Sequence, residues 1–481
     1  MITSTRMAAV DRNAEALGVP RRQLMESSGH AIARTVRELA DPGDHIQLVC
    51  GRGNNGGDAF VAARFLDEMV ITISLLGQPE LIRTDIAKAN WDALIAAEYD
   101  CESWTDSSAI DLAEADLLVD AMIGTGVSGP LREPIASAAE QMNHIDTHIL
   151  SVDVPSGVDP DGNKSAENAV IADHVVTFHD LKPGLVDYPA QVTIADIGIP
   201  PAAELFVNVG DVAGLDRDPD SHKGDAGRIV IIGGGPYTGA PALCGLAALR
   251  AGADLAIIAC PEQVAETVQG FSPDLIVKDL PGDRFVPSHL TELEEIIDAA
   301  DVLVIGPGLG DDETTVSAVE TLLNGYAGRA VIDADALQAV PSCETEASLL
   351  CTPHQGELAD MGGPTATDWE ARATAVSEYA TELQHTLLVK GEYDMIADSE
   401  TLRVNRTGNP GMTVGGTGDV LAGVCGALFA AKDRSAVEAG AMGAFITGTA
   451  GDYAADHRGD GLIASDVLAA VPTILWGDHD A

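Results

Sequence analysis

Short runs of aliphatic residues alternate with longer stretches of helical periodicity along almost the whole chain. The runs are rich in Val, Ile and Leu, as are the strands of a parallel sheet that is buried on both faces. Regular alternation of such strands with helices is typical of doubly wound α/β domains, in which helices cover both faces of the sheet. The strand-like runs are HIQLVC, VITISLL, ADLLVDAMI, HILSVDV and DHVVTF in the first half, and RIVIIGG, DLAIIAC, DVLVIGPG, AVIDADAL and HTLLVKG in the second.

This periodicity breaks between positions 214 and 227, where charged residues, Pro and Gly replace the aliphatic pattern. A chain of 481 residues also exceeds what one hydrophobic core usually serves. We therefore expect two α/β domains, each a doubly wound three-layer αβα structure, over residues 1–212 and 223–481, with a linker at 213–222. In such domains ligands bind at the carboxyl ends of the strands, so the loops that follow the strands are the places to look for function.

The chain carries 75 Asp and Glu against 27 Lys and Arg, a formal net charge of −48. This charge would repel nucleic acids and anionic membranes, so we expect neither as a partner. The acids are spread through aliphatic-rich sequence, which indicates a folded protein adapted to concentrated salt, where the Debye length falls to ~3 Å at 1 M. We expect a halophilic source. In a chain this acidic, a carboxylate counts as a catalytic candidate only where glycines and a strand end frame it.

No apolar run reaches the ~18 residues that a membrane span requires. The N-terminal segment contains acidic residues and lacks the long apolar core of a signal peptide, so we expect a cytoplasmic protein. The seven cysteines are scattered, odd in number and never spaced as CxxC. They therefore indicate neither a zinc site nor a disulfide framework.

The first candidate site follows the run HIQLVC. The motif GRGNNGGD, residues 51–58, places glycines, two asparagines and Asp58 before a helix, where backbone N–H groups can bind a phosphate or a ribose. The asparagine pair interrupts the spacing of the dinucleotide motif GxGxxG. An Asn/Gly turn that only caps the helix is the alternative.

Two further strand ends of the same domain carry polar side chains. ADLLVD ends at Asp120 and runs into a glycine loop at 124–130, and HILSVDVPSG ends with Asp153 and Ser156. Asn55, Asp120 and Ser156 offer hard oxygen donors, which suit an alkali or another hard cation. Such donors are common at strand ends, so their spacing alone leaves open whether they bind a metal.

The motifs NNGGD, DAxxGTG and DVPSG, in this order, resemble the amino-terminal YjeF family of NAD(P)H-hydrate epimerases over residues 1 to about 212. The resemblance implies a Rossmann-like fold and potassium bound by Asn55, Asp120 and Ser156. The segment FHDLKPGL also resembles the family and contains Lys182, whose role we leave open. Ala59 stands where the family usually has glycine, a change that removes no ligand. The resemblance further implies that the hydrated nucleotide is bound by Asn54, Asn55, Gly56, Gly57, Asp58, Gly124, Thr125, Gly126, Val127, Ser128, Gly129, Pro130 and Asp153.

In the second domain the most informative stretch is GNPGMTVGGTGDVLAGVCGALFAA, residues 408–431. A glycine-rich loop delivers Asp419 to the start of an apolar helix, where backbone N–H groups and the helix dipole can hold an anion beside a carboxylate base. The alternative is a glycine turn that only starts a helix. Four other strand ends of this domain carry GGGPYTGA, GPGLG, TPHQGEL and VKGEYD, and we expect all five to converge on one cleft.

The order GGxYxGA, GPGLG, TPHxGE, KG and GNPGMxxGGTGD resembles the carbohydrate kinase-like domain of ADP- or ATP-dependent NAD(P)H-hydrate dehydratases, which has the ribokinase fold. This resemblance runs from about residue 222 to the C-terminus. The likeness to prokaryotic fused enzymes favours ADP as cosubstrate, and Mg²⁺ is expected to accompany the nucleotide. From the sequence alone, His354 could instead cap a helix or lie in the core. The resemblance implies that Ala240, Gly308, His354 and Asp419 contact the hydrate, and that Lys390, Gly391, Glu392, Tyr393, Asp394 and Gly418 contact the adenine nucleotide.

The two resemblances together predict a bifunctional repair enzyme for the hydrated cofactors NADHX and NADPHX, with a homo-oligomeric state. Asp153 is expected to transfer a proton during epimerisation. The alternative is that it does no more than hydrogen-bond the substrate hydroxyls. Asp419 is expected to deprotonate the alcohol of the hydrate, so that phosphoryl transfer replaces hydroxide by a better leaving group. The alternatives are a small-molecule kinase of the hydroxyethylthiazole or pyridoxal type with an accessory front domain, and a non-catalytic binding protein.

Overall fold

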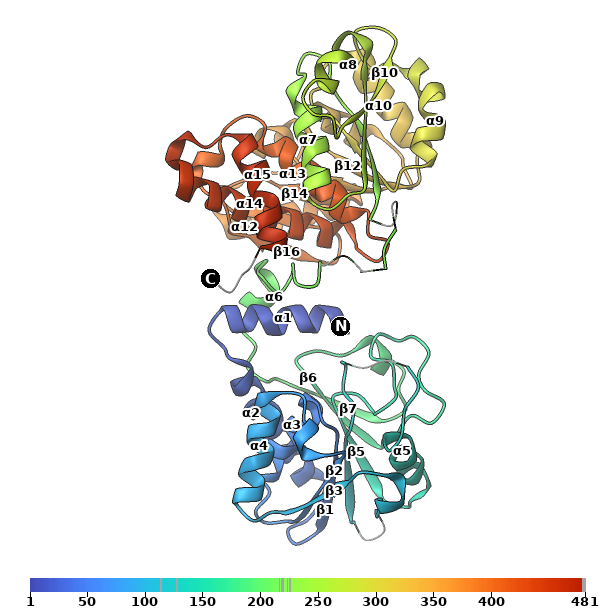
Figure 1. Ribbon diagram of the computed structural model, residues 1–481, viewed down its shortest axis with the longest axis vertical. Helices are drawn as coiled ribbons and strands as arrows, with labels where there is room; N and C mark the ends of the chain where they lie inside the picture. Colours follow the sequence, from blue (N-terminus) through green and yellow to red (C-terminus); the bar gives the residue numbers. More distant parts are fainter. Residues whose placement is uncertain are drawn as a thin grey trace. The chain divides into compact units, whose positions relative to one another are not determined.

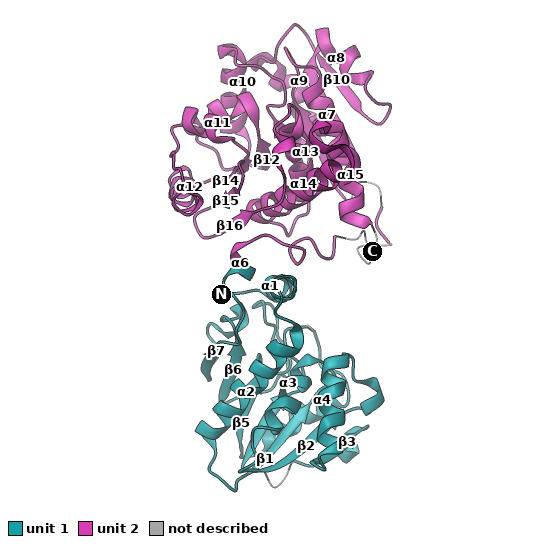
Figure 2. Cartoon of the chain, turned by 90° about the vertical axis from the view of Figure 1, so that its left-hand side faces the viewer, with its two compact units in different colours: residues 1–203 teal, residues 204–481 magenta. Residues whose placement is uncertain are grey.

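The computed structural model describes residues 1–112, 115–126, 129–215, 217, 220–222, 224 and 226–477. The chain divides into two compact units, Met1–Ala203 and Glu204–Ala481, which are coloured separately in Figure 2. Each unit is built on one mainly parallel sheet with helices on both faces, as Figure 1 shows. The predicted α/β class with two doubly wound sheets is therefore confirmed.

In the first unit the strands are all parallel and lie in the order β3-β2-β1-β4-β5-β6-β7. The order reverses between β1 and β4, and loops that leave two neighbouring strands in opposite directions open a crevice at such a point. The strands are β1 (His45–Cys50), β2 (Val70–Leu76), β3 (Asp100–Trp104), β4 (Leu117–Ala121), β5 (His148–Val152), β6 (His174–Phe178) and β7 (Gln191–Ala195).

The two faces of this sheet carry separate cores, because successive side chains of a strand point to opposite faces. Leu48 of β1 packs under the first four helices, and the next residue, Val49, packs under α5 and the loops around it. The helices are α1 (Ser4–Ala16), α2 (Arg21–Leu39), α3 (Asn54–Ala63), α4 (Asp85–Ala96) and α5 (Ile135–His144), with 3₁₀ turns η1 (Pro79–Leu81), η2 (Ser107–Ala109) and η3 (Pro183–Leu185) and the short α6 (Ala202–Leu205) at the division between the units.

The second unit has the strand order β10-β9-β8-β11-β12-β13-β14-β15-β16. Its strands are parallel up to β14, and β15 and β16 continue the sheet antiparallel. The strands are β8 (Arg228–Ile232), β9 (Leu255–Pro261), β10 (Ile276–Leu280), β11 (Val302–Ile305), β12 (Arg329–Ile332), β13 (Ser348–Cys351), β14 (Thr386–Val389), β15 (Asp394–Ala397) and β16 (Leu402–Asn405).

Helices again cover both faces of the second sheet, with Ile231 in one core and Ile232 in the other. One face carries α7 (Gly239–Arg250), α13 (Thr417–Phe429), α14 (Ala436–Arg458) and α15 (Ala464–Trp476). The other carries α9 (Leu290–Asp298), α10 (Glu313–Gly325), η5 (Ala334–Ser342), α11 (Gln355–Asp360) and α12 (Trp369–Leu383). The remaining elements are α8 (Glu262–Gln269), η4 (Pro287–His289), η6 (Pro410–Met412) and η7 (Gly459–Gly461).

Helix α13 is held in place by glycines that let its neighbours approach closely. A Cβ added at Gly423 would lie 2.1 Å from the carbonyl oxygen of Cys244 in α7, and one added at Gly443 of α14 would lie 2.4 Å from Sγ of Cys425. Helices packed this tightly transmit any shift of one to the next. The N-terminus of α13, which carries Asp419, is therefore fixed by packing along the rest of the helix.

The segment after Ala203 belongs to the second unit. Val207 donates its N–H to the carbonyl of Val404 at 2.9 Å, and Arg403 donates to both carboxylate oxygens of Asp211 at 2.9 Å. Where the independently folding domains end stays a prediction, with boundaries at 212 and 223. In the part of the chain that the structure describes, no helix is long and apolar enough to cross a membrane.

Candidate active sites

The first candidate site begins where β1 ends. Gly53 is the N-cap of α3, and Asn54 to Asp58 form its first turns, so the NNGGD motif lies inside the helix and not in a loop before it as the sequence indicated. The reason is packing: a Cβ at Gly56 would lie 2.0 Å from the carbonyl oxygen of Gly51. The glycine lets the helix start directly against the end of the strand, and its N-terminus then faces the crevice beside β4.

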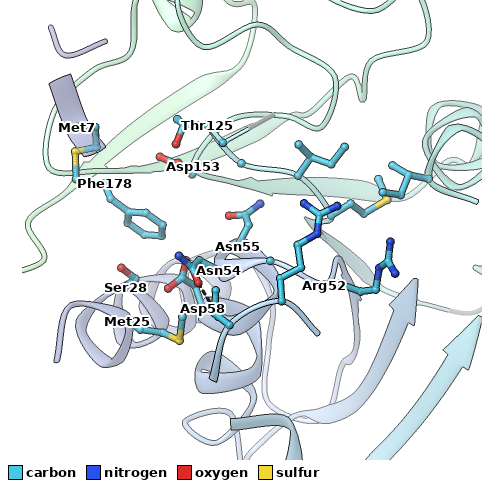
Figure 3. A pocket seen from close by; sticks show the side chains of 18 of the residues that line it. Met7, Met25, Ser28, Arg52, Asn54, Asn55, Asp58, Thr125, Asp153 and Phe178 are labelled. Carbon is cyan, nitrogen blue, oxygen red and sulfur yellow. Dashed lines mark hydrogen bonds between the residues drawn. The ribbon is translucent and has the colours of Figure 1, made fainter. Parts of the chain in front are cut away.

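A cavity of about 1070 Å³ opens at this point, slightly larger than the ~300–1,000 Å³ usual for ligand pockets. Figure 3 shows Asn54, Asn55, Asp58, Thr125 and Asp153 around it. Of the predicted substrate-binding residues, Gly56 and Gly57 are buried beneath the cavity, and Val127 and Ser128 lie outside the described residues. Those that line the cavity are Asn54, Asn55, Asp58, Gly124, Thr125, Gly126, Gly129, Pro130 and Asp153.

Asp153 is held in the cavity by a buried lysine. Lys182, only 1% exposed, places its Nζ 2.9 Å from Oδ1 of Asp153 and donates a second hydrogen bond to the carbonyl of Phe178 at 2.6 Å. Asp153 itself has a φ of 67°, a left-handed conformation that is costly for a residue with a side chain. A strained backbone and a buried ion pair thus fix this carboxylate at the end of β5.

Two more carboxyls crowd the same place. Asp11 of α1 lines the cavity, and burial, with a smaller contribution from the charge of Asp153, raises its pKa to about 6 against the opposing effect of Arg21. Burial and the charges of Asp153 and Asp11 raise the pKa of Asp58 well above its usual range. The role of Asp11 could not be predicted from the sequence, because Asp11 is one of 75 acidic residues and lies in a helix without any motif.

Of the three predicted cation ligands, Asn55 lines the cavity, whereas Asp120 and Ser156 are buried and hydrogen-bonded to each other. Asp120 is fully buried and accepts hydrogen bonds from the Oγ and N–H of Ser156 at 2.6 and 2.8 Å and from Oγ of Ser151 at 2.8 Å. Asn55 donates to the carbonyl of Val152 at 3.2 Å, which leaves its side-chain oxygen for another partner. Burial raises the pKa of Asp120, against the effect of these hydrogen bonds, and no basic side chain among the described residues pairs with it. A buried carboxylate flanked by neutral oxygens fits a monovalent cation as its counter-charge.

In the second unit four of the five predicted motifs follow the parallel strands β8, β11, β13 and β14, whose carboxyl ends lie at one edge of the sheet, and the fifth follows β16. The turn after β8 meets the turn after β11, where Gly234 donates to the carbonyl of Pro307 at 2.8 Å. A Cβ at Gly308 would lie 2.3 Å from the carbonyl oxygen of Tyr237 and 3.3 Å from Cβ of Ala240, and the φ of Gly308 is 74°. The predicted hydrate contacts Ala240 and Gly308 are therefore neighbours.

Asp419 lies in the first turn of α13, and the N-cap Gly416 adopts a φ of 99°. Burial raises the pKa of Asp419 to about 7, with a further contribution from the charge of Asp333, whereas Lys390 opposes the shift. A carboxyl with this pKa can accept a proton near neutrality, as a general base must. The helix N-terminus and the predicted nucleotide contact Gly418 lie beside it, where a Cβ at Gly418 would be 3.4 Å from Nζ of Lys390.

Lys390 reaches a carboxylate that the sequence did not identify. Its Nζ lies 3.0 Å from Oδ1 of Asp333, which follows β12, and 3.7 Å from Glu357. Asp333 is buried and also accepts a hydrogen bond from Oγ1 of Thr352 at 2.7 Å. The pattern of AVIDADAL predicts only a strand. A carboxylate at the end of a buried strand is, however, the same feature that pointed to Asp153.

His354 is the N-cap of α11. Its Nδ1 accepts the N–H groups of Gly356 and Glu357 at 2.9 and 3.1 Å, and Glu357 in return accepts the N–H of His354 at 2.7 Å. The capping alternative therefore describes part of its role. The side chain is 60% exposed, however, and its Nε2 lies 3.7 Å from Oε1 of Glu357. Nδ1 therefore serves the fold, and the exposed edge of the ring is open to a ligand.

The predicted nucleotide contacts Lys390, Gly391, Glu392, Tyr393 and Asp394 form the turn between β14 and β15. Tyr393 stacks on Trp369 with ring centroids 5.4 Å apart. Asp394 accepts hydrogen bonds from Gly391 N–H and Asn405 Nδ2, both at 2.9 Å, and burial raises its pKa to about 6. The turn is thus held from both sides, with Lys390 at the cleft and Glu392 exposed to solvent.

Comparison with known proteins covers both units. Residues 21–184 match a family model described as the YjeF-related protein N-terminus, and residues 229–473 match one described as NAD(P)H-hydrate dehydratase. Among solved structures, a hypothetical protein of Streptococcus mutans has a TM-score of 0.50 at 23% identity and covers 56% of this chain and 98% of its own. That likeness concerns the fold alone.

Full-length relatives match the two units at once. The bifunctional NAD(P)H-hydrate repair enzyme Nnr of Pyrobaculum aerophilum is 42% identical over 98% of this chain and 98% of its own. The protein of the same name from Methanothermobacter thermautotrophicus is 41% identical over 98% of this chain and 94% of its own. The predicted resemblance is confirmed over both halves, and the chain belongs to the family of bifunctional NAD(P)H-hydrate repair enzymes.

Proposed function

We propose that this protein repairs hydrated nicotinamide nucleotides in two steps. The first unit interconverts the R and S epimers of NADHX and NADPHX, and the second dehydrates the S epimer to NADH or NADPH at the expense of ADP, giving AMP and phosphate. The observation that carries this proposal is that single relatives with the bifunctional name cover 98% of the chain, so neither unit is an unrelated addition. The kinase alternative is not favoured, because it leaves the first unit without a role.

Epimerisation needs a proton given and a proton taken at the carbon beside the ring nitrogen. The hydroxyl leaves as water after protonation, and the nitrogen lone pair stabilises the resulting cation. Water then adds to the opposite face and loses a proton, so that the reaction is balanced. Asp153, fixed by Lys182, would accept that proton, and the raised pKa values of Asp11 and Asp58 make them the candidates to supply the first one.

We assign potassium to Asn55, Asp120 and Ser156. The ion would neutralise the buried carboxylate of Asp120 and keep the loops after β4 and β5 together, since Ser156 also accepts the N–H of Ile123 at 3.0 Å. The loop that begins at Ile123 carries Gly124 and Thr125 of the cavity wall. The potassium ion would therefore act structurally, by ordering the residues that hold the substrate.

Dehydration in the second unit would begin with phosphoryl transfer. Asp419 removes the proton of the hydrate's alcohol, the oxygen attacks the terminal phosphorus of ADP, and AMP leaves. The ring nitrogen then expels the new phosphate ester with its bonding electrons, and the adjacent carbon loses a proton to give the double bond of NADH. The N-terminus of α13 and Lys390 would stabilise the charge on the transferring group.

Mg²⁺ would accompany the nucleotide. In the described part of the chain, no three His, Cys, Asp or Glu side chains gather as a metal centre. Mg²⁺ usually keeps several waters and binds through one or two carboxylates together with substrate phosphates, so the carboxylate of Asp333 and the phosphates of the nucleotide would suffice. We further propose ADP and the hydrates as the small-molecule partners, a homo-oligomer, and a cytoplasmic location.

The test is recovery of NADH from its hydrate, followed by the absorbance of the reduced nicotinamide. Recovery of both epimers with ADP, and much less with ATP, supports the proposal in full. Recovery of the S epimer alone would remove the first unit from the reaction. Phosphorylation of hydroxyethylthiazole or pyridoxal without any recovery of NADH would establish the kinase alternative instead.

A further inference from the structure

The cavity of the first unit is unusually rich in cations for this protein. Of the described residues that line it, five are Lys or Arg and seven are Asp or Glu, whereas the whole chain has 27 and 75. The protein therefore spends nearly a fifth of its basic side chains on one cavity. Lys182 and Arg21 have carboxylate partners, Asp153 and Glu15 respectively, and the other three cations are Arg52, Arg83 and Arg132.

These three arginines make no ion pair and no side-chain hydrogen bond with any residue that the structure describes. Their neighbours in sequence do not neutralise them: Glu133 accepts hydrogen bonds from Oγ of Ser137 at 2.7 Å and from Ser107, and Asp85 lies in the first turn of α4, where the helix dipole favours its charge. Unpaired arginines in a chain with so many carboxylates indicate a site that is reserved for an external anion.

The three come from separate parts of the chain, and all of them line the cavity. Arg52 follows β1, Arg83 precedes α4, and the two are tied by a hydrogen bond from Arg83 N–H to the carbonyl of Arg52 at 2.8 Å. The stem of Arg52 lies over Gly77, where an added Cβ would be 2.8 Å from its Cδ. Arg132 comes from the glycine loop after β4.

The cavity therefore has two chemically different ends. In Figure 3, Met7, Phe178 and Asp153 lie on one side, Arg52 lies on the other, and Asn54 and Asn55 lie between them. The first end offers an apolar surface, an aromatic ring and the fixed carboxylate, as a ring that reacts by proton transfer requires. The second end carries the guanidinium group of Arg52, which matches phosphate oxygens in geometry as well as in charge, and Arg83 is bonded to Arg52 through the backbone.

We propose that Arg52, Arg83 and Arg132 bind the phosphate groups of the hydrated dinucleotide and so place its reacting ring against Asp153. This inference rests on the proposed epimerase function and adds the residues that hold the substrate at its far end. Two phosphates could fill the site: the pyrophosphate, which NADHX and NADPHX share, and the 2′-phosphate, which NADPHX alone carries. A solvated arginine surface without a ligand is the competing explanation.

The test measures epimer interconversion by chromatography, without ADP or ATP so that the second unit stays silent. Arg52→Gln, Arg83→Gln, Arg132→Gln and the triple variant are compared with wild type on NADHX and on NADPHX. Lys88→Gln is the matched control. Lys88 is an exposed cation in α4, the helix that begins shortly after Arg83, and it does not line the cavity. All are assayed at the same high salt, where screening removes long-range effects and only direct contacts persist.

Each single variant is expected to raise KM about tenfold with little change in kcat, as for the loss of one charge-assisted hydrogen bond. The triple variant should raise KM further, and Lys88→Gln should not change it. An increase for both substrates identifies the pyrophosphate as the ligand, and an increase for NADPHX alone identifies the 2′-phosphate. An unchanged KM in the triple variant, or a loss confined to kcat, overturns this inference. Wild-type protein that fails to interconvert the epimers overturns the proposed function itself, which is a separate outcome.

Discussion

Nζ of Lys182 and Oδ1 of Asp153 are 2.9 Å apart, and the lysine is buried whereas the carboxylate lines a cavity. The second unit repeats this arrangement, with Lys390 3.0 Å from Asp333 beside Asp419. In each unit a lysine, a rare residue in this chain, forms an ion pair with a carboxylate at a strand end. Such pairs cost desolvation, and a cation buried in this way is better explained by the chemistry of its partner than by stability.

Replacing Lys182 by Met should lower the rate of epimerisation by about 10² or more, because the carboxylate of Asp153 loses the ion pair that holds it in place. The measurement is the rate of epimer interconversion. Dehydration of the purified S epimer serves as the internal control and should be unchanged. An interconversion rate equal to that of wild type would show that Lys182 only supports the fold.

Asp419→Asn should lower dehydration by ~10²–10⁴, the usual contribution of a general base, and leave epimerisation intact. The amide keeps the shape of the side chain and cannot accept the proton. Both activities are measured on the same sample, so that misfolding of the whole chain would be recognised. Equal loss of the two activities would contradict the assignment of separate sites to the two units.

Dehydration should depend on pH through Asp419, whose pKa burial raises to about 7. The base form exists above this pH, so kcat at saturating nucleotide should rise with pH and level off above about 7. Asp333→Asn removes a neighbouring negative charge and should move this rise to lower pH, whereas Lys390→Met should move it to higher pH. Shifts in the same direction for the two variants would exclude Asp419 as the titrating group.

Asp120→Asn should weaken the potassium dependence of epimerisation. The amide lacks the charge that attracts the ion and keeps one of the two acceptor oxygens that Ser151 and Ser156 use. The measurement is the half-saturating potassium concentration at constant ionic strength made up with sodium. An increase of about tenfold is expected for the loss of one charged ligand. A potassium dependence identical to wild type would remove Asp120 from the metal site.

Dilution of salt should unfold or inactivate the protein. With a net charge of −48, lowering the ionic strength lengthens the Debye length to ~30 Å at 0.01 M, and the surface carboxylates then repel one another across the molecule. Circular dichroism and activity followed during stepwise dialysis provide the measurement. A folded, active protein in dilute buffer would contradict the expectation of a halophilic source.

The central strands could be predicted from the sequence and the edge strands could not. Ile46 to Cys50 of β1 are all buried, so they form an apolar run that only Gln47 interrupts. The edge strands β3, β7 and β10 are covered less, and only the last residue of each is buried, which leaves a weak pattern. The β15–β16 hairpin could not be predicted either, because its strands are four residues long and antiparallel in a region expected to be parallel.

The candidate sites divide in the same way. Residues framed by glycines at strand ends, such as Asn55, Asp153 and Asp419, could be predicted, because a parallel sheet brings strand ends together whatever the loops contain. Asp11 could not, since it reaches the cavity from a helix with no local signal. Arg52, Arg83 and Arg132 can be recognised only from the structure, because their common feature is that no carboxylate among the described residues pairs with them.

The cap formed by His354 also decides what this side chain can do in the cleft. Because Nδ1 accepts two backbone N–H groups, the neutral ring carries its hydrogen on Nε2. In this tautomer the exposed nitrogen gives a hydrogen bond and takes none. His354 is thus suited to donate a hydrogen bond to a carbonyl or phosphate oxygen of a ligand, and in this tautomer neither ring nitrogen is free to accept a proton.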